Sequence, residues 1–450
     1  MIRALLFTVS ILTLTGCASL SPIQRETATD TGLTLPGGYD YAAEIEALTV
    51  PEQSWWAGFN SAALNALITE ALAANNTLAQ GVANVDASRA TLRTANAAFL
   101  PQASGSLSSS SNTQSGIEDV DASARLSASY QLDLFGANAA SRNAALANLD
   151  AAIFSQRALE LTVQSDVAAG WFNLLSAREQ LAVAKQNLEI SERIFEIVEF
   201  RYEAGAISGF DVSSQSAQLA NARARIPQLE SQITSLETSL AILLGRVPQG
   251  YEAPQADVLS IALPIADPGL PSDLLLRRPD LMQSEAGLRA ANANLDAARA
   301  AFFPSVDLGA GLSSALTGGT DLVGSLSASV AQTIFSGGRL DAQLEGAQAR
   351  REGQLAAYRQ SILSALRDVD VSLKAIDAGA AREEQLLIAR DAAREALRAA
   401  EIQYQAGTGD LTALLNAQQN AFDASNSYVI GRLDRLTAAI NLYVAVGGNY

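Results

Sequence analysis

The sequence predicts an α+β membrane protein that is mainly helical and carries a small antiparallel β region of four strands. Two long stretches contain no proline and have the composition of helices. Short runs elsewhere alternate apolar and polar residues, which is typical of strands with one apolar face. The chain also repeats itself at an offset of about 203 residues, so each half is expected to contribute the same elements.

The repeat is visible in two pairs of segments. Phe99-Leu100-Pro101 matches Phe302-Phe303-Pro304, and "RYEAGAISGFD" from Arg201 matches "QYQAGTGDLTA" from Gln403. Matches in the same order at one offset indicate a duplication of a half-chain of about two hundred residues. This unit is too long for a solenoid repeat and indicates two-fold internal symmetry of sequence.

The segment 1–16 is typical of a secretory signal peptide. Arg3 is followed by an apolar run over residues 4–14, which is too short to span a membrane as a mature helix. The run ends in Leu14-Thr15-Gly16-Cys17, which resembles the lipobox of bacterial lipoproteins. The resemblance implies cleavage before Cys17, a lipid on its sulfur and, because Ala18 is not aspartate, sorting to the outer membrane. The alternative is a chance cysteine in an ordinary signal.

The strands are expected in pairs, one pair in each half. Residues 103–107 and 124–134 alternate in the first half, and residues 306–312 alternate in the second. Turn-rich loops at 112–121 and 315–322 separate the paired strands. Runs of about ten residues suit a tilted strand that crosses a bilayer.

The helices account for the rest of the chain. The proline-free stretches 137–202 and 339–405 predict helices on the order of 100 Å long. Shorter helices are expected at about 209–245 and 273–302, stacked end to end beside a long one. The break between them, with the segment before about residue 60, is expected to form a belt around the middle.

Four strands cannot close into a barrel. An open edge in lipid leaves backbone groups unpaired at several kcal/mol each, so other copies of the chain must pair with the edges. Two copies would give eight strands and a filled interior, whereas three would give twelve strands and a lumen. A filled barrel would block a helical tube, so we favour three copies.

Composition excludes several functions. The chain has no histidine, one cysteine and two methionines, so it lacks the residues for a Ser-His-Asp triad, a Cys-His pair or the commoner zinc sites. Its net charge of −17 argues against nucleic acid as a partner. We therefore expect no enzyme activity, no cofactor and no metal site.

Several motifs resemble one family of channels. They are Leu274-Leu275-Leu276-Arg277-Arg278-Pro279-Asp280, Ala224-Arg225-Ile226-Pro227-Gln228-Leu229-Glu230, the Tyr-x-Ala-Gly turns at Tyr202 and Tyr404, and "LLNAQQ" from Leu414. The chain resembles the TolC/OprM class of outer-membrane efflux channels, specifically the NodT-like lipoprotein subunits that serve RND pumps. The resemblance implies a homotrimer whose 12-stranded β-barrel continues into a long periplasmic α-helical barrel.

The resemblance also implies the function. Such a trimer is the outer-membrane exit duct of a tripartite efflux pump, and it passively conducts small molecules and drugs to the outside. Its partners are a periplasmic adaptor (membrane fusion) protein, an inner-membrane RND transporter and outer-membrane lipid. The expected domains are a signal peptide at 1–16, a lipidated segment and part of the belt at 17–60, repeats at 61–245 and 272–450, and an equatorial linker at 246–271.

The expected gate lies where the long helices turn back, at the end far from the barrel. Gly205 and Gly407 supply a permissive backbone for tight turns. The resemblance places the closing and adaptor contacts at the periplasmic tip, at Tyr202, Asp211, Tyr404, Thr408 and Asp410. Asn416 stands where the family usually has aspartate, and Asp410 is the candidate substitute for that charge.

Two other functions were compared with efflux. A type I protein-secretion channel has the same architecture, but the lipobox and the arginine-proline motif favour efflux. A lipid-anchored periplasmic coiled-coil scaffold would have no use for four runs of membrane-spanning length.

Overall fold

The computed structural model describes residues 31–39, 54–111, 120–264, 269, 271–317 and 321–448. The predicted signal peptide and Cys17 lie outside these residues. The chain divides into two units, Met1–Leu33 and Thr34–Tyr450. The fold described below is that of the second unit.

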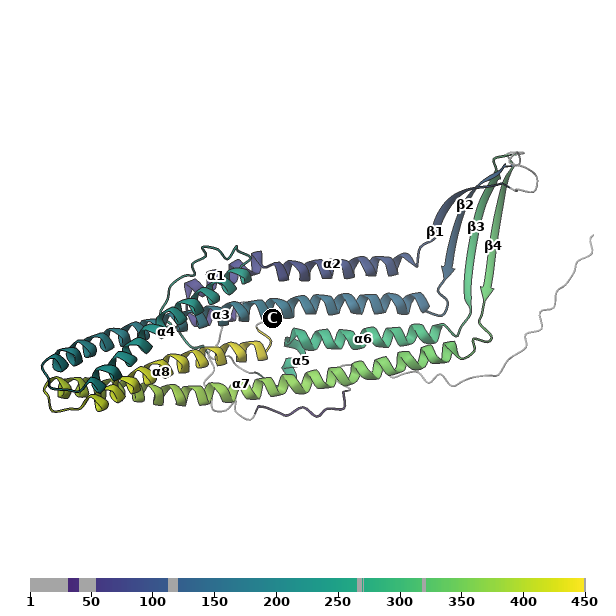
Figure 1. The fold of residues 1–450 in the computed structure, drawn as a ribbon. Helices are drawn as coiled ribbons and strands as arrows, with labels where there is room; N and C mark the ends of the chain where they lie inside the picture. The colour runs from purple at the N-terminus through teal and green to yellow at the C-terminus, as the bar shows by residue number, and fades with distance from the viewer. Residues whose placement is uncertain are drawn as a thin grey trace, which may run out of the picture. The chain divides into compact units, whose positions relative to one another are not determined.

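The described part of the second unit is mostly helical (Figure 1). Its α-helices are α1 Ala62–Ala74, α2 Asn76–Ala97, α3 Ala137–Glu203, α4 Gly209–Leu243, α5 Leu274–Arg277, α6 Pro279–Ala300, α7 Arg339–Gln405 and α8 Leu411–Ala445. Short 3-10 helices, η3 Trp55–Phe59 and η4 Pro271–Asp273, precede α1 and α5. The two predicted long helices are confirmed: α3 and α7 each contain 67 residues. No helix in the described ranges is long and apolar enough to cross a membrane.

The repeat extends to every major element. Helix α2 begins at Asn76 and its equivalent α6 begins at Pro279. Helix α3 begins at Ala137 and its equivalent α7 begins at Arg339. Both pairs of helix starts differ by the offset of the sequence repeat to within one position. The two halves of the chain therefore fold into the same order of helix, strand pair, long helix and return helix.

The four strands form one antiparallel sheet in the order β1-β2-β3-β4. They are β1 Gln102–Ser111, β2 Val120–Leu132, β3 Ser305–Ala315 and β4 Leu322–Ala331. Leu126 of β2 lies opposite Gly105 of β1 and Leu312 of β3, so the register places apolar residues together. On the opposite face the hydroxyls of Ser104 and Ser127 bond at 2.9 Å. The sheet thus has one apolar and one polar face, as the alternation predicted.

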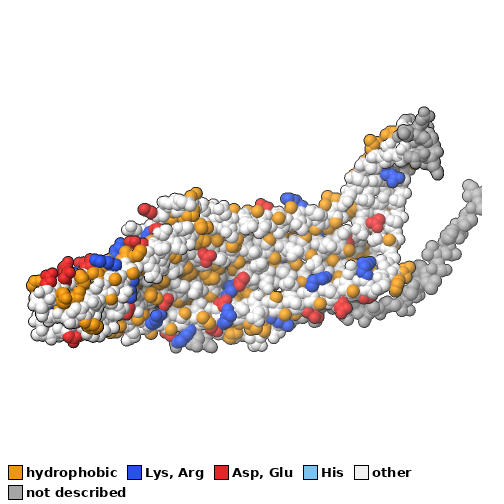
Figure 2. Space-filling model, viewed as in Figure 1, with side chains coloured by type: hydrophobic (Ala, Val, Ile, Leu, Met, Phe, Trp, Pro, Cys, Tyr) orange, Lys and Arg blue, Asp and Glu red, His pale blue; other side chains and the backbone are white. Residues whose placement is uncertain are grey.

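Charge is distributed unevenly along the molecule. In the view of Figure 2, charged side chains are sparse on the sheet and frequent over the helices. The charged residues within the four strands are Asp121, Arg125 and Asp307. A surface with few charges is compatible with contact to lipid on its apolar face.

The stacking of the return helices differs from the expectation. The side-chain amide of Asn75, just before α2, donates to the carbonyl of Leu243 at the end of α4 at 2.8 Å. Arg278, just before α6, donates to the carbonyl of Ala445 at the end of α8 at 3.1 Å. The end of α4 therefore lies against the start of α2, and the end of α8 against the start of α6. The expectation that segments 209–245 and 273–302 stack on one another is wrong. The side chain that donates to the end of each return helix belongs to the same repeat as that helix.

An aromatic cluster fills the middle of the molecule. Trp55 stacks on Tyr443 with ring centroids 5.4 Å apart, and its indole N–H donates to Gln164 at 2.9 Å. Phe59 packs on Phe172 with centroids 5.1 Å apart. These contacts hold the segment before α1 against α3 and α8.

Two arginines hold the segment after α4 at the same level. Arg178 of α3 donates to the carbonyl of Pro254 at 2.8 Å and pairs with Glu237 of α4 at 2.6 Å. Arg432 of α8 donates to the carbonyl of Ile261 and pairs with Glu383 of α7 at 3.2 Å. The linker therefore contacts both helical hairpins, as a belt would.

Candidate functional site at the hairpin turns

The two turns that reverse the long helices have the same backbone. Gly205 and Gly407 follow α3 and α7 with φ of 73° and 76°, in the left-handed region that favours glycine. Ala206 N–H donates to the carbonyl of Arg201 at 2.9 Å, and Thr408 N–H donates to the carbonyl of Gln403 at 3.0 Å. This 6→1 bond is that of a Schellman motif, so both long helices end by the same mechanism.

The acidic residues of the tip cap the return helices. The carboxylate of Asp211 accepts from the backbone N–H of Ser208 at 3.0 Å and from its hydroxyl at 2.9 Å. The carboxylate of Asp410 accepts from Ala413 N–H at 2.8 Å. The Thr408 hydroxyl donates to the Gln403 carbonyl at 3.2 Å. Within one chain, these three residues therefore bond to groups of their own turn.

Arg201 joins the two hairpins at the tip. Its guanidinium lies over the ring of Tyr404, 4.4 Å from the centroid. It also donates to the carbonyl of Tyr404 and, at 3.4 Å, to that of Gln405. These carbonyls belong to the last turn of α7, where the helix dipole favours a cation. Arg201 was not among the predicted site residues, although it begins the first turn motif.

Tyr404 and its repeat equivalent Tyr202 have different environments. Tyr404 is 2% exposed and Tyr202 is 50% exposed. The pKa of Tyr404 is raised above its ordinary value, mainly because the side chain is buried. Arg201 opposes this shift, and the negative charge of Asp211 adds to it. The structure therefore brings Tyr404 and Arg201 into direct contact. Asn416 is exposed on the first turns of α8.

A buried polar layer lies behind the tip. Gln215 of α4 donates to the carbonyl of Ser191 in α3 at 2.9 Å. Gln418 of α8 donates to the hydroxyl of the same Ser191 at 2.6 Å and to Asn187 at 3.1 Å. Gln215 and Gln418 are only 0% and 1% exposed. One turn of α3 therefore bonds to both return helices, a link that the sequence motifs did not reveal.

The arginine-proline motif lies at the middle of the molecule. Pro279 is the first residue of α6, as predicted. Arg278 forms two bonds with Asp280, at 3.0 and 2.8 Å, and pairs with Asp368 of α7 at 3.5 Å. With its bond to Ala445, this arginine joins α6, α7 and α8. Arg277 is by contrast half exposed and pairs with Asp273 at 3.8 Å.

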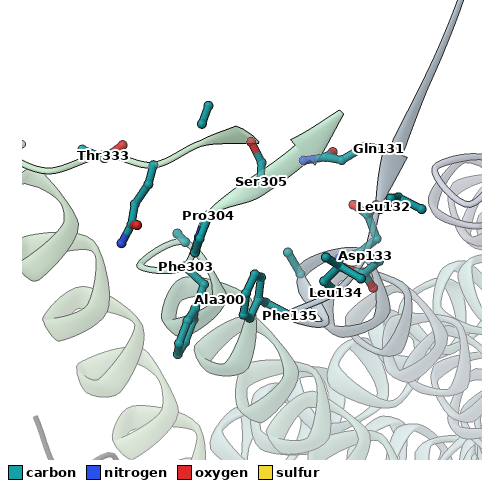
Figure 3. Close-up of a pocket in the computed structure, with 15 residues that line it drawn as sticks. Gln131, Leu132, Asp133, Leu134, Phe135, Ala300, Phe303, Pro304, Ser305 and Thr333 are labelled. Carbon is teal, nitrogen blue, oxygen red and sulfur yellow. Dashed lines mark hydrogen bonds between the residues drawn. The ribbon is translucent and has the colours of Figure 1, made fainter. Parts of the chain in front are cut away.

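The strand–helix junction is held by stacked aromatic rings. Phe135, after β2, stacks on Phe303, before β3, with centroids 5.0 Å apart and an interplanar angle of 11°. Both line a pocket of about 360 Å³ between the sheet and the helices (Figure 3). Asp133 accepts from the N–H groups of Asn138 and Ala139 at 3.0 and 2.8 Å, which caps α3. The sheet is thereby fixed to the helices that continue it.

No group of three or more metal-ligating side chains occurs among the residues that the structure describes. The geometry instead shows an amphipathic sheet, long helices and a polar tip. The model of the family described as "Outer membrane efflux protein" matches residues 67–246 and again residues 270–448. The chain therefore belongs to the outer membrane efflux protein family.

Relatives and solved structures agree with this assignment. The chain is 34% identical over 441 residues to the pyoverdine export outer membrane protein OpmQ of Pseudomonas aeruginosa, covering 94% of this chain and 92% of that protein. Its fold matches the outer-membrane channel OprN with a TM-score of 0.82 at 26% identity, over 93% and 97% of the two chains. The open-state MtrE channel of Neisseria gonorrhoeae matches with a TM-score of 0.81 at 27% identity, over 92% and 96%.

Proposed function

We propose that three copies of this chain form the outer-membrane exit duct of a tripartite efflux pump. The twelve strands would close a β-barrel in the membrane, and the helices would continue it as an α-barrel across the periplasm. The observation that carries this proposal is an amphipathic sheet with two unpaired edges that continues directly into helices on the order of 100 Å long.

The sheet supports a shared barrel. Among the described residues, β1 pairs only with β2, and β4 pairs only with β3. In lipid, each unpaired backbone group costs several kcal/mol, so both edges require a partner strand. Another copy of the chain supplies both edges at once. Three copies leave a lumen that a filled eight-stranded barrel lacks.

The anchor is a lipid on Cys17. The lipobox-like sequence lies outside the described residues, so the proposal rests on the sequence and on the outer-membrane assignment of the family. Mass spectrometry of the mature chain should find Cys17 as a lipidated N-terminus. An intact signal peptide or an unmodified later residue would contradict it. Cys17→Ala should weaken anchoring without abolishing it, because the barrel also holds the protein in the membrane.

The tip is the proposed gate and adaptor site. Arg201 contacts the ring of Tyr404 and donates to carbonyls at the end of α7, so these contacts hold the two hairpins against each other, while Asp211 caps the neighbouring return helix. A periplasmic adaptor that docks on the turns, including Tyr202, Gly205, Gly407, Thr408 and Asp410, would shift the tip from closed to open. The inner-membrane RND transporter supplies the cargo and the energy.

The cargo is a small molecule that the pump selects. The relative OpmQ is described as exporting pyoverdine, and the present chain would conduct its cargo passively without catalysis or a cofactor. Purified protein in planar lipid bilayers tests this proposal. A duct gives discrete single-channel currents, whereas inserted protein that carries no current would contradict the proposed function.

A further inference from the structure

The two outer strands of the sheet carry apolar side chains that are largely exposed. Leu107 of β1 is 75% exposed and Val330 of β4 is 71% exposed. We propose that β4 of one copy pairs antiparallel with β1 of the next copy in one specific register, with Val330 opposite Leu107 of the neighbouring copy. This inference rests on the proposed ring of copies and adds the residue-by-residue contact that closes it.

The register follows from the repeat. Gln102 of β1 lies opposite Ser129 of β2, and Ser305 of β3 lies opposite Ala331 of β4. Gln102 and Ser305 each follow the proline of the repeated junction, so these two strand pairs are equivalent. In the repeat, Gln102 is therefore equivalent to Ser305, and Ser129 is equivalent to Ala331. The offset in residue number between the second pair of equivalent positions is one smaller than that between the first pair. The first shift also relates the starts of α2 and α6, and the second relates the starts of α3 and α7.

The pairing of β2 with β3 is the template for the missing contact. Inside the chain, the second strand of the first repeat pairs with the first strand of the second repeat. In a ring, the second strand of the second repeat meets the first strand of the next copy's first repeat. Ala128 lies opposite Ala310, and the same shifts convert this pair into Val330 opposite Leu107. Ser127 opposite Gly311 becomes Ser329 opposite Ser108.

The side chains provide an independent check, because the shifts use no information on polarity. In the transferred register, Val330 and Leu107 lie on the same apolar face, and Ser329 and Ser108 lie on the polar face. A slip of one residue would move the whole apolar set of one strand to the polar face of the other. The transferred register therefore continues both faces of the sheet across the boundary between copies.

The lengths of the strands agree with this pairing. β2 has 13 residues and β4 has 10. The ladder between β1 and β2 ends at Ser129, and the last residues of β2 pair only with β3, as Leu132 does with Val306. The equivalents of these last residues are 332–334, and Ile334 is 97% exposed. We infer that β4 extends to Ile334 on assembly, opposite Ala103 of the next copy.

The helices below the sheet follow the same order as the strands. Helix α2 contacts α3, α3 contacts α6, and α6 contacts α7. Figure 1 shows α2 and α7 on opposite sides of this layer, below the β1 and β4 edges. The contact of α3 with α6 is the equivalent of a contact between α7 and α2 of the next copy. The repeat therefore closes the sheet and the helical layer together.

Disulfide cross-linking of the full-length protein in membranes tests the register. The chain has one cysteine of its own, Cys17, so the single variants S329C and S108C measure its background. The test variant combines S329C with S108C, and a second variant combines V330C with L107C. Hydrogen-bonded and non-hydrogen-bonded pairs alternate along an antiparallel ladder, so these two variants include one of each kind. The matched control combines S329C with S106C, which corresponds to a slip of two residues on the same face.

After oxidation, at least one of the two test variants should give about tenfold more covalent trimer than the control. Directly opposite Cβ atoms lie about 5 Å apart and diagonal ones about 7–8 Å apart, whereas a disulfide requires about 4 Å. Reduction should abolish the covalent trimer. Light scattering before oxidation separates the two proposals. A trimer in which the control cross-links as well as or better than both test variants would overturn the register alone, and a monomer would overturn the ring as well.

Discussion

At the scale of single residues, the tip depends on Arg201. This side chain makes a ring contact and carbonyl hydrogen bonds between α3 and the end of α7. Hydrogen bonds from a charged group contribute about 1.5–3 kcal/mol and a cation–π contact about 0.5–1 kcal/mol. Arg201 therefore links the two hairpins directly at the turns.

Arg201→Ala should open the tip. Loss of about 1.5–3 kcal/mol would shift the equilibrium toward the open state by roughly ten- to a hundredfold. Single-channel recording should show larger or longer openings, and cells should become more sensitive to large antibiotics. Arg193→Ala is the matched control, because Arg193 is exposed on the same helix and pairs only locally with Glu189 at 3.0 Å. Equal conductance of the two variants would exclude Arg201 from the gate.

Asn416 is a neutral, exposed residue on the second turn of α8, near the proposed entrance. Asn416→Asp adds a carboxylate at an exposed position near the turn, so the entrance should become more cation-selective. The reversal potential in a salt gradient measures this selectivity. Asn416→Gln, which adds no charge, should leave the reversal potential unchanged. If aspartate has no more effect than glutamine, Asn416 does not face the conduction path.

The residue level also shows what sequence could not predict. The positions of Gly205, Gly407, Asp211 and Tyr404 at the turns could be predicted because turn residues form a local motif. Arg201 has its role only because segments from the two halves of the chain come together in the fold. The burial of Tyr404 and the exposure of Tyr202 differ for the same reason, since both occur in matching motifs.

At the scale of elements, each return helix ends against a polar side chain at the start of a shorter helix. Asn75 performs this role for α4, and Arg278 performs it for α8. The two positions are repeat equivalents with different residues. The lengths of the two long helices α3 and α7 were predictable from proline-free runs. The partner of each helix end was not, because spacing along the chain does not specify lateral order.

Arg278→Ala should destabilise the middle of the molecule. The side chain of Arg278 is 11% exposed. Its removal would eliminate the ion pairs with Asp280 and Asp368 and the hydrogen bond to the Ala445 carbonyl. Loss of hydrogen bonds made by a charged, partly buried group costs about 1.5–3 kcal/mol. Arg277→Ala is the matched control, since that side chain is 46% exposed and a surface pair contributes about 0–1 kcal/mol. Thermal unfolding in detergent should separate the two variants, and equal melting temperatures would contradict the role of Arg278.

At the scale of the whole molecule, the described strands form an open four-stranded sheet, which the proposed ring of copies would close. The sheet is amphipathic and its two edges are open among the described residues. The helices α3 and α7 contain 67 residues each. The sequence repeat places equivalent surfaces on the two sides of the chain. The sequence predicted this architecture well because period-two runs and proline-free stretches are local signals. It could not specify the proposed contact between copies, because that contact would depend on the register of strands far apart in sequence.

The number of copies in the particle tests the central claim most directly. The purified, lipidated protein should be measured in mild detergent by light scattering that corrects for bound detergent. Three chains per particle are expected, because twelve strands close a barrel with a lumen and satisfy both edges of every sheet. A stable particle of one chain, or of two chains with a filled barrel, would contradict it.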